Sequence, residues 1–157
     1  MFRNAVKQTA KLSLALAVVL VLSSCSWGGD NKKPQERQTN FNYENQSLGF
    51  EVELPQTFKH YVTQRDQGEG FVDIEVYIPT SDTDYSSEVR NYARPITIRV
   101  FQNTSLEELS EDSPYEVLAQ ANNDIYTIRF WENIPQDWQE KWSEETEESI
   151  KNSFRLK

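Results

Sequence analysis

Few side chains of the 157-residue chain could carry out covalent or proton-transfer chemistry. The chain holds one histidine, His60, and one cysteine, Cys25, which excludes a His/Cys zinc site and an intramolecular disulfide. A serine nucleophile would need His60 as its base, and no G-x-S-x-G elbow is present. His60 stands between Lys59 and Tyr61 at the entry to an expected strand, which indicates a structural or exposed histidine. We therefore expect no catalytic residue and no cofactor.

Residues 82–88 place oxygen ligands at alternate positions, as calcium-binding loops do. Asp82, Asp84 and Glu88 are the weak candidate metal ligands of this segment. An EF-hand needs glycine at the sixth position and glutamate at the twelfth, where this chain has Ser87 and Ala93. The pattern favours a solvated acidic loop without a metal, and calcium binding is the alternative.

Aromatic side chains are the other candidate site residues. Trp131, Trp138 and Trp142 cluster at an expected strand–helix junction, where a sugar or a peptide could stack. Tryptophans at helical spacing more often belong to a core. Alternation puts Trp131 on the face opposite Phe130, so Trp131 and Phe101 would share an exposed patch if helices cover only one side of the sheet. A concave pocket at this surface would favour a ligand, and a flat patch a partner.

The first 25 residues have the pattern of an export signal. Three cations, Arg3, Lys7 and Lys11, precede the apolar run Leu12–Leu22, which only Ser13 interrupts. At 1.5 Å per residue this run spans roughly 16 Å, about half of a bilayer core. It is too short for a transmembrane helix and is typical of a signal peptide.

Residues Leu22–Cys25 resemble the lipobox of bacterial lipoproteins, in which an aliphatic residue and two small residues precede the cysteine that is diacylated before cleavage. The resemblance implies that residues 1–24 are removed and that Cys25 carries diacylglycerol and palmitate. The alternative is an ordinary secretory signal with an incidental cysteine. Ser26 replaces the aspartate associated with inner-membrane retention. We expect a lipid anchor on the extracytoplasmic face of the cell membrane, or in the outer membrane if the source has one.

The charge balance excludes one class of partner. Lys and Arg number 16 against 25 Asp and Glu, a formal net charge of −9, which argues against nucleic acid. Loss of residues 1–24 removes three cations and no anion, so the mature charge would be −12. Anionic lipid repels such a chain, so acyl chains must hold it at the membrane. Residues 25–40 are expected to be the lipidated cysteine and a flexible tether.

Residues 41–157 are expected to form a single domain. Alternating apolar and polar residues predict strands at 50–54, 71–78, 96–100 and 126–130, each with one face buried in an antiparallel sheet. Turns at 67–70 and 122–124 would join two of them to strands at 60–65 and 115–121. Ser105 and Glu108 predict a capping box before a short helix. Pro135 would open a longer helix with Trp138, Trp142 and Ile150 on one face. These elements predict an α+β domain, an antiparallel sheet flanked by helices.

Both ends of this domain resemble PsbP-like domains, a family that includes photosystem accessory proteins and the Mog nuclear import factors. Tyr43–Pro55, an aromatic hairpin that leads into Gly49 and Phe50, is similar to their start. The amphipathic helix followed by Ile150–Phe154 is similar to their end. The resemblance implies an α/β/α sandwich, leaves the middle of the chain unmatched and carries no catalytic or binding residue.

The sequence thus predicts a membrane-anchored envelope lipoprotein with a non-catalytic accessory or interaction domain, docking on an unidentified envelope protein. The alternative is a module that binds a small ligand, a glycan or calcium through the Trp131 region or the Asp82–Glu88 loop. A hydrolase that uses carboxylates is a third hypothesis. It is disfavoured because the Glu144–Glu148 run is most simply the solvated face of a helix.

Overall fold

A computed structural model describes residues 40–110 and 112–157 of the chain. Within these residues, eight strands form two antiparallel sheets, accompanied by one α-helix and two single 3-10 turns. The elements in chain order are β1 Phe41–Asn45, β2 Phe50–Leu54, β3 Val62–Gln67, β4 Phe71–Pro79, β5 Tyr92–Phe101, η1 Leu106–Glu108, β6 Glu116–Ala121, β7 Asp124–Phe130, η2 Gln136–Trp138, α1 Glu144–Ser153 and β8 Arg155–Leu156.

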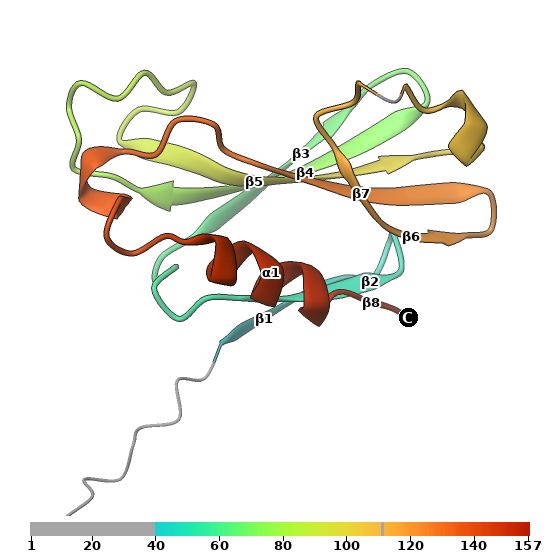
Figure 1. Cartoon of the computed structure of the whole chain (residues 1–157), viewed down its shortest axis with the longest axis horizontal. Coiled ribbons are helices and arrows are strands. Elements are labelled where there is room, and N and C mark those ends of the chain that lie inside the picture. Colours follow the sequence, from blue (N-terminus) through green and yellow to red (C-terminus); the bar gives the residue numbers. More distant parts are fainter. Residues whose placement is uncertain (1–39, 111) are drawn as a thin grey trace, which may run out of the picture. The chain divides into compact units, whose positions relative to one another are not determined.

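The two sheets build a two-layer domain. The larger sheet has five strands in the order β3-β4-β5-β7-β6, and the smaller has three in the order β1-β2-β8. The small sheet and α1 lie together beneath one face of the larger sheet (Figure 1). No α-helix of the described chain covers the opposite face, which we call the outer face. The loops 80–91 and 102–115 rise beyond the outer face at opposite ends.

The alternating runs formed strands because each has one buried face. On β2, Phe50, Val52 and Leu54 are fully buried, whereas Glu51 and Glu53 keep contact with solvent. The strands predicted at 71–78, 96–100 and 126–130 are confirmed within β4, β5 and β7. Burial of one side of each strand therefore decides the local structure here.

Both predicted hairpin turns are confirmed. Residues 68–70 join β3 to β4, and Asn122 and Asn123 join β6 to β7. The φ angles of the two asparagines are 52° and 66°. Positive φ at both central residues is the geometry that a two-residue hairpin turn needs to match the twist of its strands.

Aromatic rings join the two layers into one core. Phe50 on β2 stacks on Phe154 with ring centroids 5.4 Å apart and meets Tyr126 of β7 edge-on at 6.2 Å. The Tyr126 hydroxyl donates to the carbonyl of Leu48 at 2.9 Å. These contacts connect the small sheet to the large one, so a single hydrophobic cluster extends through both.

The long helix predicted from Pro135 is wrong, because the segment is split. Pro135 precedes only η2, and α1 begins separately at Glu144, where the side chain of the N-cap Ser143 accepts the backbone N–H of Thr146. A serine in this extended conformation caps a new helix instead of continuing an old one. Trp138 therefore lies on η2 and Trp142 in the connection before α1, and both pack on the ring of Phe58.

The predicted α/β/α sandwich of PsbP-like type is also wrong. The described chain has one α-helix of ten residues, and the capping box at Ser105 opens only the three-residue turn η1. Ser113 and Pro114 follow soon after, and both residue types disfavour a helix interior. The domain is consequently mainly β, with an antiparallel sheet that helices do not flank on both sides. Among the described residues, no helix has the length and apolar character needed to cross a membrane.

Candidate functional site

The outer face of the larger sheet carries charged and polar side chains from three strands. The register places Asp73 of β4 opposite Arg99 of β5, and Glu75 opposite Thr97. Thr97 in turn stands opposite Arg129 of β7. Because alternate residues of a strand share one face, the inward neighbours on the same strands can still fill the core.

A β-bulge adds another arginine to this face. Arg94 and Pro95 stand opposite the single residue Tyr77, and Arg94 pairs with Glu75 and, at 3.1 Å, with Glu88. Burial alone would lower the pKa of Arg94, but the two glutamates outweigh it and raise that pKa. Burial, with a 2.8 Å hydrogen bond to Glu75, raises the pKa of Tyr77 to about 12. Near neutral pH the outer face therefore carries Arg94 as a cation and Tyr77 as a protonated phenol.

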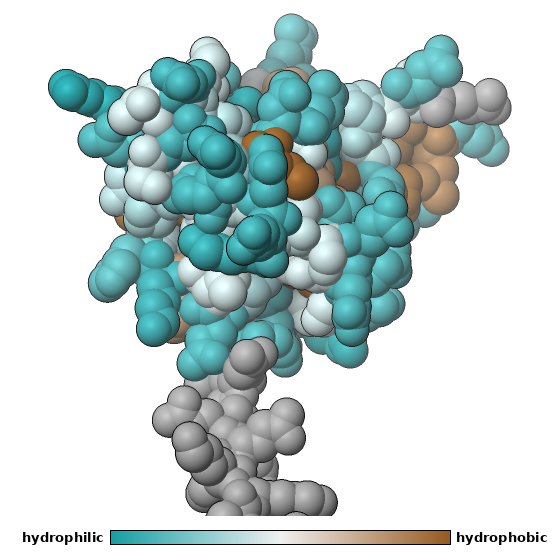
Figure 2. All heavy atoms as spheres, turned by 60° about the vertical axis from the view of Figure 1, so that its left-hand side comes forward, coloured by the Kyte–Doolittle hydropathy of each residue, from teal (hydrophilic) through white to brown (hydrophobic). Residues whose placement is uncertain are grey.

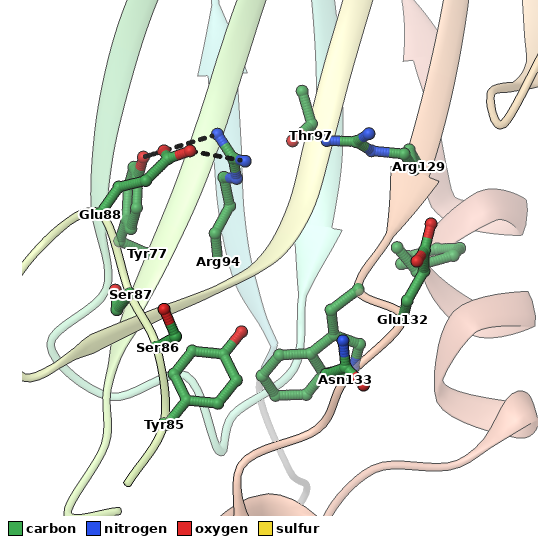
Figure 3. A pocket seen from close by; sticks show the side chains of 12 residues that line it. Tyr77, Tyr85, Ser86, Ser87, Glu88, Arg94, Thr97, Arg129, Glu132 and Asn133 are labelled. Atoms are coloured by element: carbon green, nitrogen blue, oxygen red, sulfur yellow. Dashed lines mark hydrogen bonds and ion pairs between the residues drawn. The ribbon is translucent and has the colours of Figure 1, made fainter. Parts of the chain in front are cut away.

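The outer face is hollowed between the two loops that rise beyond it. A cavity of about 270 Å³ adjoins loop 80–91, and a more open one of about 660 Å³ adjoins loop 102–115. Both are lined by Arg94, Thr97 and Arg129, and together they form what we call the arginine groove. In Figure 3, Arg129 points toward Thr97, while Tyr85 and Ser86 face the strands from the loop. The larger cavity falls within the usual size range of small-ligand sites, and the smaller one lies just below it.

Two arginines of the groove differ in what already binds them. Arg99 donates to both carboxylate oxygens of Asp73, at 2.7 and 2.6 Å, and lies over the rings of Phe71 and Tyr115 at 3.8 and 4.5 Å. The hydrogen bonds to Asp73 raise the pKa of Arg99. Arg129 forms no ion pair and no side-chain hydrogen bond with any residue that the structure describes, and its guanidinium lies over the ring of Tyr115 at 5.2 Å. The Arg129 guanidinium thus has donors to offer.

The three predicted tryptophans have different roles. Trp138 and Trp142 are buried, and their indole N–H groups donate to the Pro79 carbonyl at 3.0 Å and to Glu147 at 2.8 Å. They form core and offer no binding surface. Trp131 is half-buried, lines the arginine groove and packs edge-on against Trp142 at 5.0 Å. Its buried indole nitrogen finds no hydrogen-bond partner within the described segments.

Phe101 and Trp131 do not form one exposed patch. The register pairs Phe101 with Ile125 at one end of the strands and Ile96 with Phe130, the neighbour of Trp131, at the other. Five residues of strand span about 17 Å. Each aromatic side chain therefore lines its own hollow of the groove. The side of the molecule turned forward in Figure 2 is largely hydrophilic, with few apolar spheres.

The candidate metal ligands do not converge. The two carboxylate oxygens of Asp82 accept the backbone N–H groups of Asp84 and Gln136, at 3.0 and 2.8 Å. Glu88 is turned toward Arg94. Among residues 40–110 and 112–157, no three His, Cys, Asp or Glu side chains are grouped to hold a metal. Asp82 serves instead to join its loop to the η2 segment.

Sequence reasoning missed the groove itself. The alternation of apolar and polar residues predicts Thr97 and Arg129 only as solvent-facing positions of two strands, and it gives no role to Arg94 or Tyr85. One signal was present, because β4 carries acidic and β5 basic residues at outward positions, which suits adjacent antiparallel strands. The hollow depends on two loops that are distant in sequence, and no local pattern reports their approach.

The remaining predictions concern residues away from the groove. His60 lies exposed in a turn with φ of 64° and lines neither cavity. Cys25 and residues 25–39 of the expected tether lie outside the described residues. No protein-family model, no curated protein and no solved structure matches the chain. Lipidation and membership of the PsbP-like family accordingly stay predictions.

Proposed function

We propose that this chain is a lipid-anchored protein of the cell envelope whose domain binds a small ligand in the arginine groove without converting it. The observation that carries the proposal is the hollowed outer face, which presents the Arg129 guanidinium beside half-buried aromatic side chains. Polar donors converging in a cavity are the usual features of a ligand site. The anchor rests on the resemblance of Leu22–Cys25 to a lipobox.

The concave surface favours a ligand over a protein partner. Trp131 and Phe101 line two hollows and do not share a flat apolar patch. A stable docking surface is usually large and has an apolar centre. Docking on an envelope protein remains the second candidate function, and the groove experiment below separates the two.

The anchor is tested by metabolic labelling with alkyne-palmitate in a bacterial host. The full chain should take up label and sediment with membranes, because Cys25 would carry diacylglycerol on its thiol and, after cleavage, an acyl chain on its amino group. Cys25→Ser should lose both the label and the sedimentation. Ser24→Ala keeps a small residue before the cysteine and should behave like the unaltered chain. Label that persists in Cys25→Ser would contradict the proposed anchor.

Ligand binding is tested by thermal melts of the detergent-solubilised full chain with a panel of glycans, metabolites and peptides. A ligand at 100 times its dissociation constant adds about 2.7 kcal/mol, which raises the melting temperature by several degrees. Ser86→Trp should abolish the shift, because this exposed residue lines the groove and the larger side chain would fill it. Thr83→Trp, exposed on the same loop but outside the lining, is the matched control. An unshifted panel would favour protein docking instead.

A further inference from the structure

The position of Arg129 makes it the anchor point for a ligand. It lies on β7 directly opposite Thr97 and lines both hollows of the arginine groove. Among the described residues it has no carboxylate partner, unlike Arg94 and Arg99, which pair with glutamate or aspartate. A guanidinium presents a planar fork of N–H donors that matches a carboxylate. The ligand group expected at Arg129 is therefore a planar anion such as a carboxylate.

The surrounding charge limits that anion to a single negative charge. The smaller cavity is lined by Arg94 and Arg129 but also by Glu88 and Glu132, and Glu75 pairs with Arg94 beside it. Two cations against three carboxylates leave a site that would repel a dianion such as phosphate. A monoanionic carboxylate is repelled less and gains the same fork of donors.

The same charges favour a cation elsewhere on the ligand. Glu132 lines the cavity and forms no ion pair in the described parts of the chain. Figure 3 shows its carboxylate on the β7 side of the opening, with Arg129 next to it. An ammonium group at Glu132 and a carboxylate at Arg129 would each meet an opposite charge. Trp131 and Tyr85 line the same cavity and provide aromatic surface for an apolar body of the ligand.

We infer that the arginine groove binds a small zwitterion, with its carboxylate on Arg129 and its ammonium on Glu132. An amino acid or a short peptide with free ends has this chemistry, and so does an amino sugar acid. This inference rests on the proposed function and names the ligand class of the same site. The cavity of about 270 Å³ lies just below the usual size range of ligand sites, which limits the ligand to a small molecule.

The probes are the dipeptide Ala–Phe and derivatives that lack one charge. Titration calorimetry of the detergent-solubilised full chain should show binding of Ala–Phe. Its C-terminal amide and its N-acetyl form should each bind roughly ten- to hundredfold more weakly, the effect of losing a charged hydrogen bond. Muramic acid distinguishes an amino sugar acid from a peptide as the source of the zwitterion. An amide that binds as tightly as the acid, or phosphate that binds more tightly than either zwitterion, would overturn the inference.

Variants assign each charge to its residue. Arg129→Gln should bind Ala–Phe and its amide alike and weakly, because the group that recognises the carboxylate is gone. Glu132→Gln should likewise stop distinguishing Ala–Phe from its N-acetyl form. Arg90→Gln removes an exposed arginine that lines neither cavity and should leave all affinities unchanged. Variants that keep the discrimination of the unaltered chain would contradict the assignment.

The inference and the proposed function can fail separately. If a neutral glycan binds, loses binding in Ser86→Trp, and neither zwitterion binds, the zwitterion is wrong and the groove remains a ligand site. If Ser86→Trp leaves the affinity of every ligand unchanged, the groove is not the site and both are wrong.

Discussion

At the scale of single residues, the ion pairs of the described domain differ in how far they are removed from water. Asp73 is buried at 6% exposure, and Arg99 encloses it with two hydrogen bonds while lying over Phe71. The pair of Glu116 with Lys151 has its carboxylate largely in solvent, at 59% side-chain exposure. Water competes for an exposed pair, so the two should contribute very differently to stability.

Asp73→Asn should lower the free energy of unfolding by about 2–3 kcal/mol. The substitution leaves Arg99 without its counter-charge, and the loss stays below that of a fully enclosed pair because the Arg99 side chain keeps 22% exposure. Glu116→Gln, the control, should cost less than about 1 kcal/mol. Urea denaturation of the full chain measures both, and equal losses would show that burial does not set the difference.

At the scale of elements, a single carboxylate joins loop 80–91 to the segment before α1. Asp137 of η2 accepts hydrogen bonds from the Thr80 hydroxyl at 2.7 Å and from the Ser81 N–H and hydroxyl at 3.0 and 3.1 Å. Burial alone would raise the pKa of Asp137, but these hydrogen bonds outweigh it and lower that pKa. The ionised form is thus the one that holds the wall of the groove.

Asp137→Ala should destabilise the protein by roughly 1–3 kcal/mol at pH 7, because the donors on loop 80–91 lose their acceptor. Because the pKa of Asp137 is lower in the folded state than the ordinary aspartate value of about 3.9, its ionisation stabilises the folded protein fully above that ordinary value. This contribution is lost as the pH falls through the lower, folded-state pKa. The difference in unfolding free energy between Asp137→Ala and the unaltered chain should therefore become smaller below about pH 4. Urea titrations from pH 7 to pH 3 measure it. Asp84→Ala removes an exposed carboxylate, and its unfolding free energy should match that of the unaltered chain at every pH.

The break before α1 predicts a second effect at this scale. Ser143→Ala should cost about 1 kcal/mol, because the first turn of α1 loses the side-chain oxygen that caps it. Ser149→Ala, on the exposed side of the same helix, changes the same residue type without a cap and should be neutral or slightly stabilising. Thermal melts compare the two variants. A loss for Ser149→Ala as large as for Ser143→Ala would argue that helix propensity and not capping is measured.

At the scale of the described domain, the two sheets depend on each other through their shared core. Phe50 of the small sheet contacts Tyr126 of the large sheet and Phe154 after α1. Phe58, which follows β2, is enclosed by Trp138 and Trp142. Neither sheet buries its inner face without the other, so neither should persist alone.

Unfolding should accordingly be a single cooperative transition. Tryptophan fluorescence, sensitive to the region around Trp138 and Trp142, and far-ultraviolet circular dichroism of the strands should give the same midpoint in urea. Phe50→Ala should lower that midpoint for both probes together, because the lost aromatic side chain reduces the free energy of unfolding by about 3–5 kcal/mol. Val117→Ala, at a side chain 50% exposed, should leave both nearly unchanged. Two separate midpoints would show that the sheets unfold independently.

What the sequence determined by itself is the set of local elements. Apolar and polar residues alternate along Phe50–Leu54 and the other strands, so that one face of each strand must be buried. This pattern depends only on residues that are neighbours in the sequence. The asparagines at 122 and 123 tolerate positive φ wherever the chain places them, so their turn is equally local. These features need no knowledge of distant segments, and the structure contains them where the pattern indicates.

Only the tertiary structure decided how those elements cover one another. The helix expected from Pro135 ends early because Trp138 and Trp142 enter a core built with Phe58 from the other end of the domain. The outer face remains open because no α-helix of the described chain reaches it, and it is a groove because the loops 80–91 and 102–115 rise at its two ends. Strand alternation reports that a face is polar. Whether that face becomes a flat surface or a binding site depends on contacts between residues far apart in the chain, and packing alone sets those.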